Sequence, residues 1–248
     1  MKPHTSYTVC GTPRSGSGLL CEALWKTGLA GRPDEYFLPK REREYSKIWG
    51  TSTYFEYFNK VVEKGTTPNG VFGAKIMWDQ VGYFREKVLR IPQYMHLQTP
   101  DLMGCIFPNL HYIRITRRDK VRQAVSFYKA KKTGIYNWHE GEPTQYIETL
   151  EFNFKAIDRL IHNLCDWDSS WQNYFEALKI SPFNVVYEDD LEHGYEGVIK
   201  RILTYLGVNI PDGLTIQAKR RKQSDEHSER FVRLYLDALQ GNKKNQRE

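Results

Sequence analysis

The apolar residues of the chain fall into short continuous runs separated by longer stretches with helical spacing. The short runs are rich in β-branched and aromatic residues, which is typical of buried strands. They predict strands at residues 7–10, 71–77, 110–116 and 183–187. The stretches between them predict a helix that Ser17 caps and that runs through Trp25, and further helices at 119–130, at 144–178 and at 195–206, with a last helix after residue 225.

Two features refine this pattern. Across residues 144–178 the apolar positions recur at steps of three and four, interrupted once at Asp168. The apolar stripe of this long helix is more often core than a dimer interface, although a homodimer through it is a possible arrangement. Residues 31–70 show mixed signals, with turn sequences at 32–34 and 67–70.

Strands that alternate with helices predict an α/β fold with a central parallel sheet flanked by helices on both faces. The 248 residues fit one domain, which we place at 1–240, followed by a polar C-terminal tail at 241–248. In such sheets ligands bind beyond the carboxyl ends of the strands. We therefore expect the functional residues in the segments that follow each strand.

Composition and charge narrow the class of protein. A net charge of +6 favours an anionic ligand, although a solvated basic surface would produce the same balance. The N-terminus has no apolar region of a signal peptide, and no run approaches the length of a membrane span. The four cysteines are scattered without metal-binding spacing, which favours reduced thiols. We expect a cytoplasmic enzyme with no bound metal and no membrane insertion.

A glycine-rich loop follows the first strand. Gly11 and Gly16 have the GxxxxG spacing of a phosphate-binding loop, whose inward N–H groups and following helix N-terminus attract anions. A nucleotide kinase would continue with Lys and then Ser or Thr, whereas this chain continues with Ser17 and Gly18. Arg14 can supply the missing cation, and Ser15 and Ser17 can donate hydroxyl hydrogen bonds. The alternative is a plain turn between strand and helix.

A second basic segment follows the third predicted strand. Arg117 and Arg118 stand at the strand end, and Ser126 follows on the next helix. By itself this pattern is equally typical of a solvated basic helix face. A third basic cluster at 219–222 precedes the last helix. Two anion pockets and a basic flap suit a ligand with phosphate at both ends of a nucleoside.

Together these segments resemble the bacterial sulfotransferase family typified by mycobacterial trehalose 2-sulfotransferase. The sequence PRSGSGLL resembles the 5′-phosphosulfate loop of sulfotransferases, and TRRDKVRQAVSFYKA resembles their 3′-phosphate motif. Further segments resemble the family and follow one another in the same order as in its members. They are GRPDEYF (31–37), TPNGVFGAKIMWDQ (67–80), the region around Trp171, VVYEDDL (185–191) and KQSDEHSERF (222–231).

The resemblance implies a P-loop-like sulfotransferase fold. It also implies 3′-phosphoadenosine 5′-phosphosulfate (PAPS) as donor and a small carbohydrate, trehalose-like, as acceptor. It assigns Arg14, Ser15, Gly16, Ser17 and Gly18 to the 5′ loop, and Arg117, Arg118 and Ser126 to the 3′-phosphate. Fixed donors of this kind stabilise a sulfuryl group in transit without magnesium.

The resemblance further implies a general base. The family's base is a Glu in a stretch that matches Pro33–Phe37, which assigns the role to Glu35, with Arg14 as its catalytic partner on the sulfonate. Read without the family, Glu35 is an ordinary loop carboxylate. Phe37, Lys75 and Trp78 are candidates for the acceptor site, although a core position suits Trp78 equally well. Lys222, a candidate donor contact, stands where relatives tend to carry Arg.

Two other functions fit parts of the pattern. The GxxxxG spacing favours a P-loop kinase that uses ATP, but the missing Lys and Ser/Thr oppose it, and magnesium dependence discriminates the two. The basic balance and aromatic content favour a non-catalytic nucleic-acid binder, which would show steep salt dependence and a single basic stripe. Here the basic residues follow different strands, so we expect a small-molecule partner and no nucleic acid.

Overall fold

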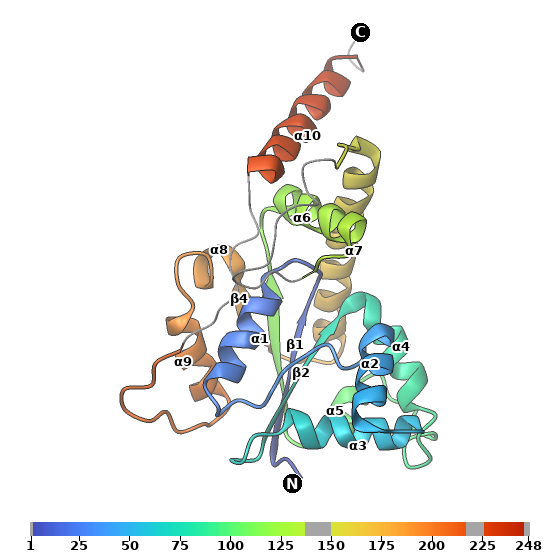
Figure 1. Ribbon diagram of the computed structural model, residues 1–248, viewed down its shortest axis with the longest axis vertical. Helices are drawn as coiled ribbons and strands as arrows, with labels where there is room; N and C mark the ends of the chain where they lie inside the picture. The colour runs from blue at the N-terminus through green and yellow to red at the C-terminus, as the bar shows by residue number, and fades with distance from the viewer. Residues whose placement is uncertain (1, 137–149, 217–225, 246–248) are drawn as a thin grey trace.

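The computed structural model describes residues 2–136, 150–216 and 226–245. Its centre is a four-stranded, fully parallel sheet with the strand order β2-β1-β3-β4 (Figure 1). The strands are β1 (Thr5–Gly11), β2 (Val71–Met77), β3 (Leu110–Thr116) and β4 (Phe183–Val186). The predicted parallel α/β architecture is confirmed, and β2 and β3 have the bounds that the apolar runs predicted.

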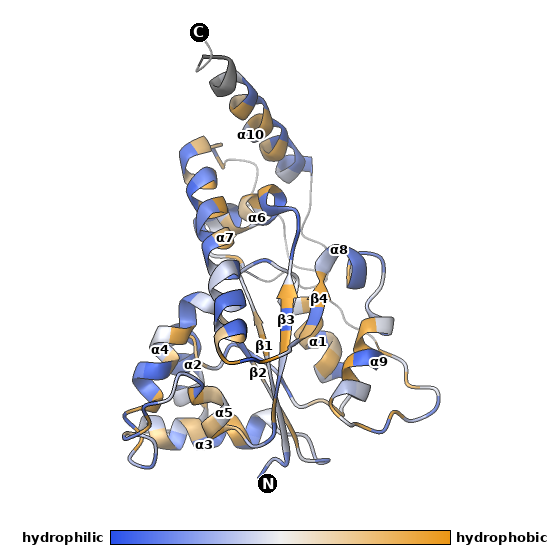
Figure 2. Ribbon diagram, turned by 180° about the vertical axis from the view of Figure 1, so that it is seen from behind, coloured by the Kyte–Doolittle hydropathy of each residue, from blue (hydrophilic) through white to orange (hydrophobic). Residues whose placement is uncertain are grey.

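Alternate residues of each strand face opposite sides of the sheet, and each side has its own core. Tyr7 and Val9 of β1 pack with α1 (Ser17–Lys26) and α9 (Glu196–Tyr205). The other face, which includes Cys10, packs with α3 (Tyr54–Gly65), α4 (Trp78–Val88), α5 (Leu102–Ile106) and α7 (Phe154–Ala177). Figure 2 shows hydrophobic residues concentrated on the strands and amphipathic banding on the surrounding helices.

A third hydrophobic cluster lies beyond the carboxyl ends of the strands. It joins α6 (Lys120–Thr133), the first half of α7 and α10 (Glu226–Asn245) through residues such as Phe127, Leu160 and Phe231. Figure 1 shows α10 at the far end of the molecule from the N-terminus. This cluster brings the last helix to the edge of the sheet where ligands bind in α/β folds.

The region with mixed signals is largely helical. It contains α2 (Pro39–Trp49) and α3, and α3 begins at a capping box in which Thr53 and Glu56 bond each other's backbone N–H groups. No residue of α2 is fully buried, and its Tyr45 and Trp49 pack only partly buried against the aromatic core, so the apolar signal of this helix is weak.

Several boundaries differ from prediction, including that of β1, which spans Thr5–Gly11 rather than 7–10. The long helix α7 begins at Phe154 rather than at 144, because the Asn153 side chain accepts a hydrogen bond from the backbone N–H of Ala156 and caps it; residues 144–149 lie outside the described ranges. Ser17 is the first residue of α1 and not its cap, since Gly16 precedes the helix in a left-handed conformation. Helix α10 continues to Asn245, into the segment expected as a polar tail.

None of the helices in the described ranges combines the length and the apolar character needed to cross a membrane.

Candidate functional site

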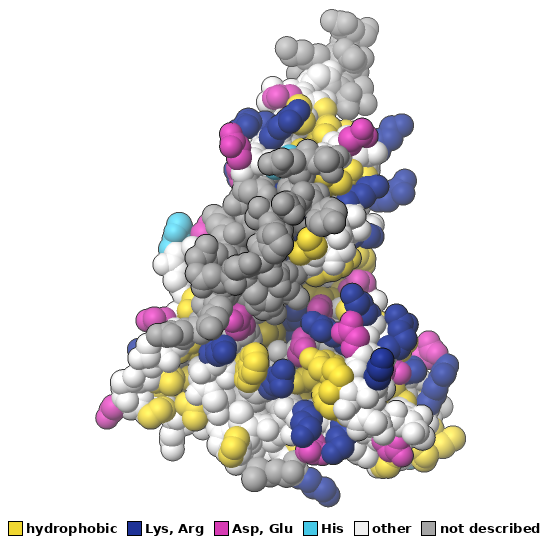
Figure 3. All heavy atoms as spheres, viewed as in Figure 1, with side chains coloured by type: hydrophobic (Ala, Val, Ile, Leu, Met, Phe, Trp, Pro, Cys, Tyr) yellow, Lys and Arg dark blue, Asp and Glu magenta, His cyan; other side chains and the backbone are white. Residues whose placement is uncertain are grey.

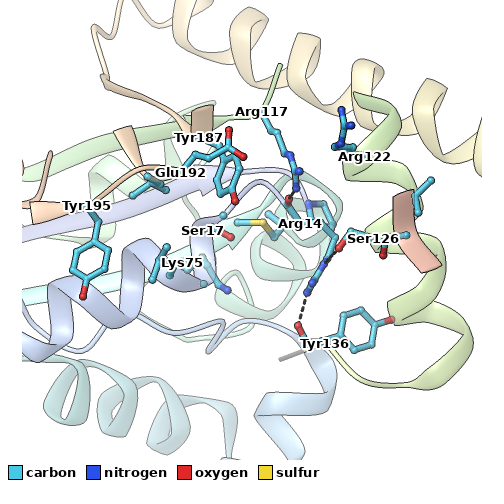
Figure 4. Close-up of a pocket in the computed structure, with 18 of the residues that line it drawn as sticks. Arg14, Ser17, Lys75, Arg117, Arg122, Ser126, Tyr136, Tyr187, Glu192 and Tyr195 are labelled. Carbon is cyan, nitrogen blue, oxygen red and sulfur yellow. Dashed lines mark hydrogen bonds between the residues drawn. The ribbon is translucent and has the colours of Figure 1, made fainter. Parts of the chain in front are cut away.

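A cavity of about 400 Å³ opens at the carboxyl end of the sheet. Its walls come from the loop after β1, the end of β2, the segments after β3 and β4, and the first turns of α10 (Figure 4). The polar residues that line it are Arg14, Ser17, Glu35, Lys75, Arg117, Arg122, Ser126, Tyr136, Tyr187, Glu192, Tyr195, Ser228 and Glu229. Segments far apart in the sequence therefore share one site.

The glycine-rich loop is shaped by close packing at both of its glycines. A Cβ on Gly11 would lie 2.8 Å from the carbonyl oxygen of Ile115, and a Cβ on Gly16 would lie 2.5 Å from Cδ2 of Tyr187. Gly16 also has a φ of 94°, which only glycine adopts without strain. The loop therefore delivers Ser17, at the N-terminus of α1, to the cavity wall, where the helix dipole favours an anion.

A buried polar network holds this loop from below. The Gln123 amide donates to Thr12 Oγ1 at 2.9 Å and to the carbonyl of Pro13 at 2.8 Å, and the Thr12 hydroxyl donates to Asp168 Oδ1 at 3.3 Å. Asp168 also forms an ion pair with Lys120. Asp168 is the polar position that interrupts the apolar stripe of the long helix, and this contact with the loop explains the interruption.

Trp171, one helical turn after Asp168, ties the loop to the core. Its side chain is fully buried, and its indole N–H donates to the carbonyl of Gly11 at 2.9 Å. Trp171→Phe removes that bond and leaves space in the core, so we expect the free energy of unfolding to fall by roughly 2–4 kcal/mol. Urea denaturation measures this loss.

The matched control is Trp25→Phe, at a tryptophan that is 41% exposed and lies on α1. We expect Trp25→Phe to lower the free energy of unfolding by about 1 kcal/mol or less, because Trp25 lies at the surface, where it forms cation–π contacts with Lys26 and Arg32. Equal losses in the two variants would contradict the role given to the indole hydrogen bond.

Arg14 reaches across the cavity to the segment that follows β3. Its Nε donates to Ser126 Oγ at 2.9 Å, and its Nη1 donates to the carbonyl of Tyr136. Figure 4 shows these three residues gathered at one end of the cavity. The backbone of Arg14 is left-handed, with a φ of 66°. The two motifs recognised in the sequence, the loop and the basic segment, therefore meet at one site.

The two neighbouring arginines have different environments. Arg117 lines the cavity, with its guanidinium 4.6 Å from the ring centroid of Tyr187 and its Nη1 donating to the carbonyl of Arg14 at 3.4 Å. Arg118 is absent from the cavity walls and forms a bidentate pair with Asp189 at 2.7 and 2.5 Å. The side-chain hydrogen bond and charge of Asp189 raise the pKa of Arg118, which stays charged.

Arg122 and Glu229 line the cavity although the sequence did not single them out. Arg122 donates to Glu229 at 3.0 and 2.8 Å and pairs with Asp119. Arg122 and Ser126 are four residues apart on α6, a spacing that places them on one helix face and could have indicated the role. Glu229 belongs to α10, and no local pattern connects it with α6.

Glu35 lies at the wall formed by the end of β2. Its Oε2 is 3.5 Å from Lys75 Nζ, and its Oε1 accepts a hydrogen bond from Gln80 Nε2 at 3.2 Å. The two side chains are 25% and 10% exposed, so the pair is largely shielded from water while still reaching the cavity. Gln80, a buried residue that sequence reasoning missed, orients the carboxylate.

Asp34 supports the segment that carries Glu35. Its carbonyl accepts a hydrogen bond from the backbone N–H of Lys75 at 3.0 Å, and its carboxylate accepts one from the Tyr45 hydroxyl at 2.5 Å. Burial alone would raise the pKa of Asp34, but the Tyr45 hydrogen bond and the charges of Lys75 and Arg41 outweigh it and lower that pKa. Asp34 is therefore a fixed charge beside the site.

Several expected site residues lie elsewhere. Phe37, expected at the acceptor site, is fully buried, packs edge-on against Phe84 at 4.7 Å and is absent from the cavity walls. Trp78 packs against Trp171 at 5.0 Å in the same core and is absent from the cavity walls. Ser15, within the glycine-rich loop, is also buried and is absent from the cavity walls. Lys222 lies outside the described residues.

Within the described ranges, no cluster of three or more His, Cys, Asp or Glu side chains has an arrangement that could hold a metal ion.

Comparison with known proteins places this site in a family. Trehalose 2-sulfotransferase of Mycobacterium tuberculosis is 28% identical over 257 residues, which cover 91% of this chain and 93% of that protein. The Mycolicibacterium smegmatis trehalose 2-sulfotransferase is 28% identical over 260 residues, covering 93% and 94%. A sulfotransferase crystal structure from Alicyclobacillus acidocaldarius aligns with 96% of this chain and 92% of its own, at 11% identity and a TM-score of 0.46.

The family model for Stf0 sulphotransferase matches residues 6–237. The match begins in β1, before the glycine-rich loop, and ends in α10, whose first turns close the cavity. It thus spans every segment that contributes to the site, and the chain belongs to the Stf0 sulphotransferase family.

Proposed function

We propose that this protein transfers a sulfuryl group from PAPS to a hydroxyl of a small carbohydrate, with Glu35 as general base. One observation carries the proposal. The cavity is lined by the glycine-rich loop, by Arg117 and Ser126, and by the ion pair of Glu35 and Lys75. Sulfuryl transfer requires residues that bind the 5′ end of the donor, residues that bind its 3′ end and a group that activates a hydroxyl. Candidate residues for all three roles thus lie at one site.

The residues present fit a bisphosphorylated nucleoside. Arg117 Nε is buried and has no hydrogen-bond partner among the described residues, which is costly unless a ligand satisfies it. Arg14 holds a left-handed backbone conformation, a form of strain that clusters at ligand sites. In this proposal Arg14, Ser17 and the amides of Gly16 and Gly18 bind the 5′-phosphosulfate, while Arg117 and Ser126 bind the 3′-phosphate.

The proposed chemistry is a direct in-line displacement. PAPS supplies an activated sulfonate. Glu35 accepts the proton that the acceptor hydroxyl loses as its oxygen bonds to sulfur, and the bond from sulfur to the 5′-phosphate oxygen breaks with its electron pair left on that oxygen. Lys75 and Arg14 stabilise the charge on the sulfonate oxygens, and adenosine 3′,5′-bisphosphate leaves.

The acceptor class rests on the relatives. Both mycobacterial relatives are trehalose 2-sulfotransferases, and each aligns over more than nine tenths of this chain. A trehalose-like disaccharide is therefore the first acceptor to test. A nucleic-acid partner has less support, since Figure 3 shows Lys and Arg intermingled with Asp and Glu on the visible face rather than gathered in one stripe.

Calorimetry with adenosine 3′,5′-bisphosphate, 5′-AMP and ATP, each with and without magnesium, tests the donor assignment. We expect adenosine 3′,5′-bisphosphate to bind without magnesium and about 10- to 100-fold more tightly than 5′-AMP, because charge-assisted hydrogen bonds to the 3′-phosphate contribute about 1.5–3 kcal/mol each. Binding of ATP only, and only with magnesium, would contradict the proposal and favour a kinase. Sulfate transfer to trehalose is then measured directly with PAPS.

A further inference from the structure

The short helix α8 (Tyr187–Asp190) follows β4 directly and lies beside the segment that follows β3. The parallel register pairs Thr116 with Val186, so the next residues along, Arg117 and Tyr187, emerge side by side at the sheet edge. Tyr187 belongs to the VVYEDDL sequence, for which the proposed function has given no role.

The Tyr187 ring contacts both halves of the proposed donor site. On one side it packs against Gly16, where a Cβ would be 2.5 Å from its Cδ2. On the other it lies 4.6 Å from the Arg117 guanidinium (Figure 4). In the described part of the chain Arg117 forms no ion pair, and its guanidinium is supported by this ring and by the carbonyl of Arg14.

The acidic residues of α8 hold the neighbouring backbone and Arg118. Glu188 accepts hydrogen bonds from the backbone N–H groups of Arg118 and Asp119, both at 3.1 Å. Asp189 forms the bidentate pair with Arg118 outside the cavity. These carboxylates bind Arg118 outside the cavity, and of the two neighbouring arginines only Arg117 lines the cavity.

We propose that Tyr187 is a positioning residue that holds the Arg117 guanidinium for the 3′-phosphate, while Glu188 and Asp189 exclude Arg118 from that contact. The proposal rests on the proposed function, because it requires a donor with a 3′-phosphate. A face of an aromatic ring attracts a guanidinium without consuming its N–H groups, so all remaining donors stay available to the phosphate. A carboxylate in the same place would compete with the phosphate.

The test is the ratio between the dissociation constants of 5′-AMP and adenosine 3′,5′-bisphosphate, measured by calorimetry. We expect Tyr187→Leu to lower this ratio about 3- to 30-fold, the range of a cation–π contact, while Tyr187→Phe keeps it. In an Arg117→Ala background, Tyr187→Leu should leave the ratio unchanged. The matched control is Phe183→Leu, which removes a ring 5.7 Å from Arg201 outside the cavity and should not alter the ratio.

Each other outcome overturns the proposal. If Tyr187→Leu weakens both nucleotides equally, the ring acts only through its packing on Gly16. If Tyr187→Phe also lowers the ratio of the two dissociation constants, the Tyr187 hydroxyl and not its ring is responsible for the preference for the 3′-phosphate. If the wild-type protein shows no preference for the 3′-phosphate, the proposed function fails first and this proposal with it. Melting temperatures of all variants identify any that fail to fold, and Tyr187→Phe keeps the test valid if Tyr187→Leu is one of them.

Discussion

Glu35→Gln is expected to lower kcat for sulfuryl transfer by roughly 10²–10⁴-fold, because an amide cannot accept the proton of the acceptor hydroxyl. Binding of adenosine 3′,5′-bisphosphate should be retained. The Gln80 amide can still donate to the carbonyl oxygen that replaces Glu35 Oε1, so the side chain keeps its orientation. Steady-state kinetics with PAPS and the acceptor, alongside calorimetry with the bisphosphate product, measure both quantities.

Glu42→Gln is the matched control for that experiment. Glu42 also pairs with a lysine, with its Oε1 2.9 Å from Lys87 Nζ, but it is absent from the cavity walls. We expect its kcat to stay close to the wild-type value. A donor affinity that falls as far as kcat in Glu35→Gln would argue against the base role and indicate that Glu35 contributes mainly to binding.

Arg117→Ala is expected to weaken adenosine 3′,5′-bisphosphate binding by about 10- to 100-fold, because it removes charge-assisted hydrogen bonds of about 1.5–3 kcal/mol each. Binding of 5′-AMP should change little, since that nucleotide lacks the 3′-phosphate. Calorimetric titration of both nucleotides separates a lost phosphate contact from a general distortion of the site.

Arg118→Ala is the adjacent control. The Arg118 side chain is 62% exposed and paired with Asp189, so we expect neither the nucleotide affinities nor the melting temperature to change appreciably. The reverse result, a selective loss in Arg118→Ala with none in Arg117→Ala, would show that the pair with Asp189 opens when the nucleotide binds and that Arg118 carries the contact.

Only part of the candidate site could be predicted from the sequence. Arg14, Ser17, Glu35, Lys75, Arg117 and Ser126 were all singled out, and the structure gathers them around one cavity. Arg14, Ser17, Arg117 and Ser126 could be found because their segments follow predicted strands, and the carboxyl ends of parallel strands meet at one edge of a sheet. Glu35 and Lys75 were indicated by the resemblance to the sulfotransferase family. Gln80 and Glu229 were missed, because a buried amide and a carboxylate on a distant helix have no local signature.

Phe37 and Trp78 were candidates for the acceptor site, with a core position as the alternative for Trp78. In the structure Phe37 is buried in the aromatic core and Trp78 packs against it, partly buried. Residues 35–37 lie in an irregular segment without the regular alternation of a strand, so a side chain near Glu35 can be directed into the core as easily as into the cavity. Which of the two directions it takes depends on the helices that pack against the sheet.

The sequence by itself determined the parallel sheet, the glycine-rich loop and the edge of the sheet at which the cavity lies. Buried strands are continuous apolar runs, and close backbone packing requires glycine, so both leave local marks. The tertiary structure alone decided that Arg117 faces the cavity while Arg118 faces solvent. That choice depends on the register between β3 and β4 and on the charges of α8, which lie about 70 residues away. Contacts between residues so distant arise only on folding, and no local spacing encodes them.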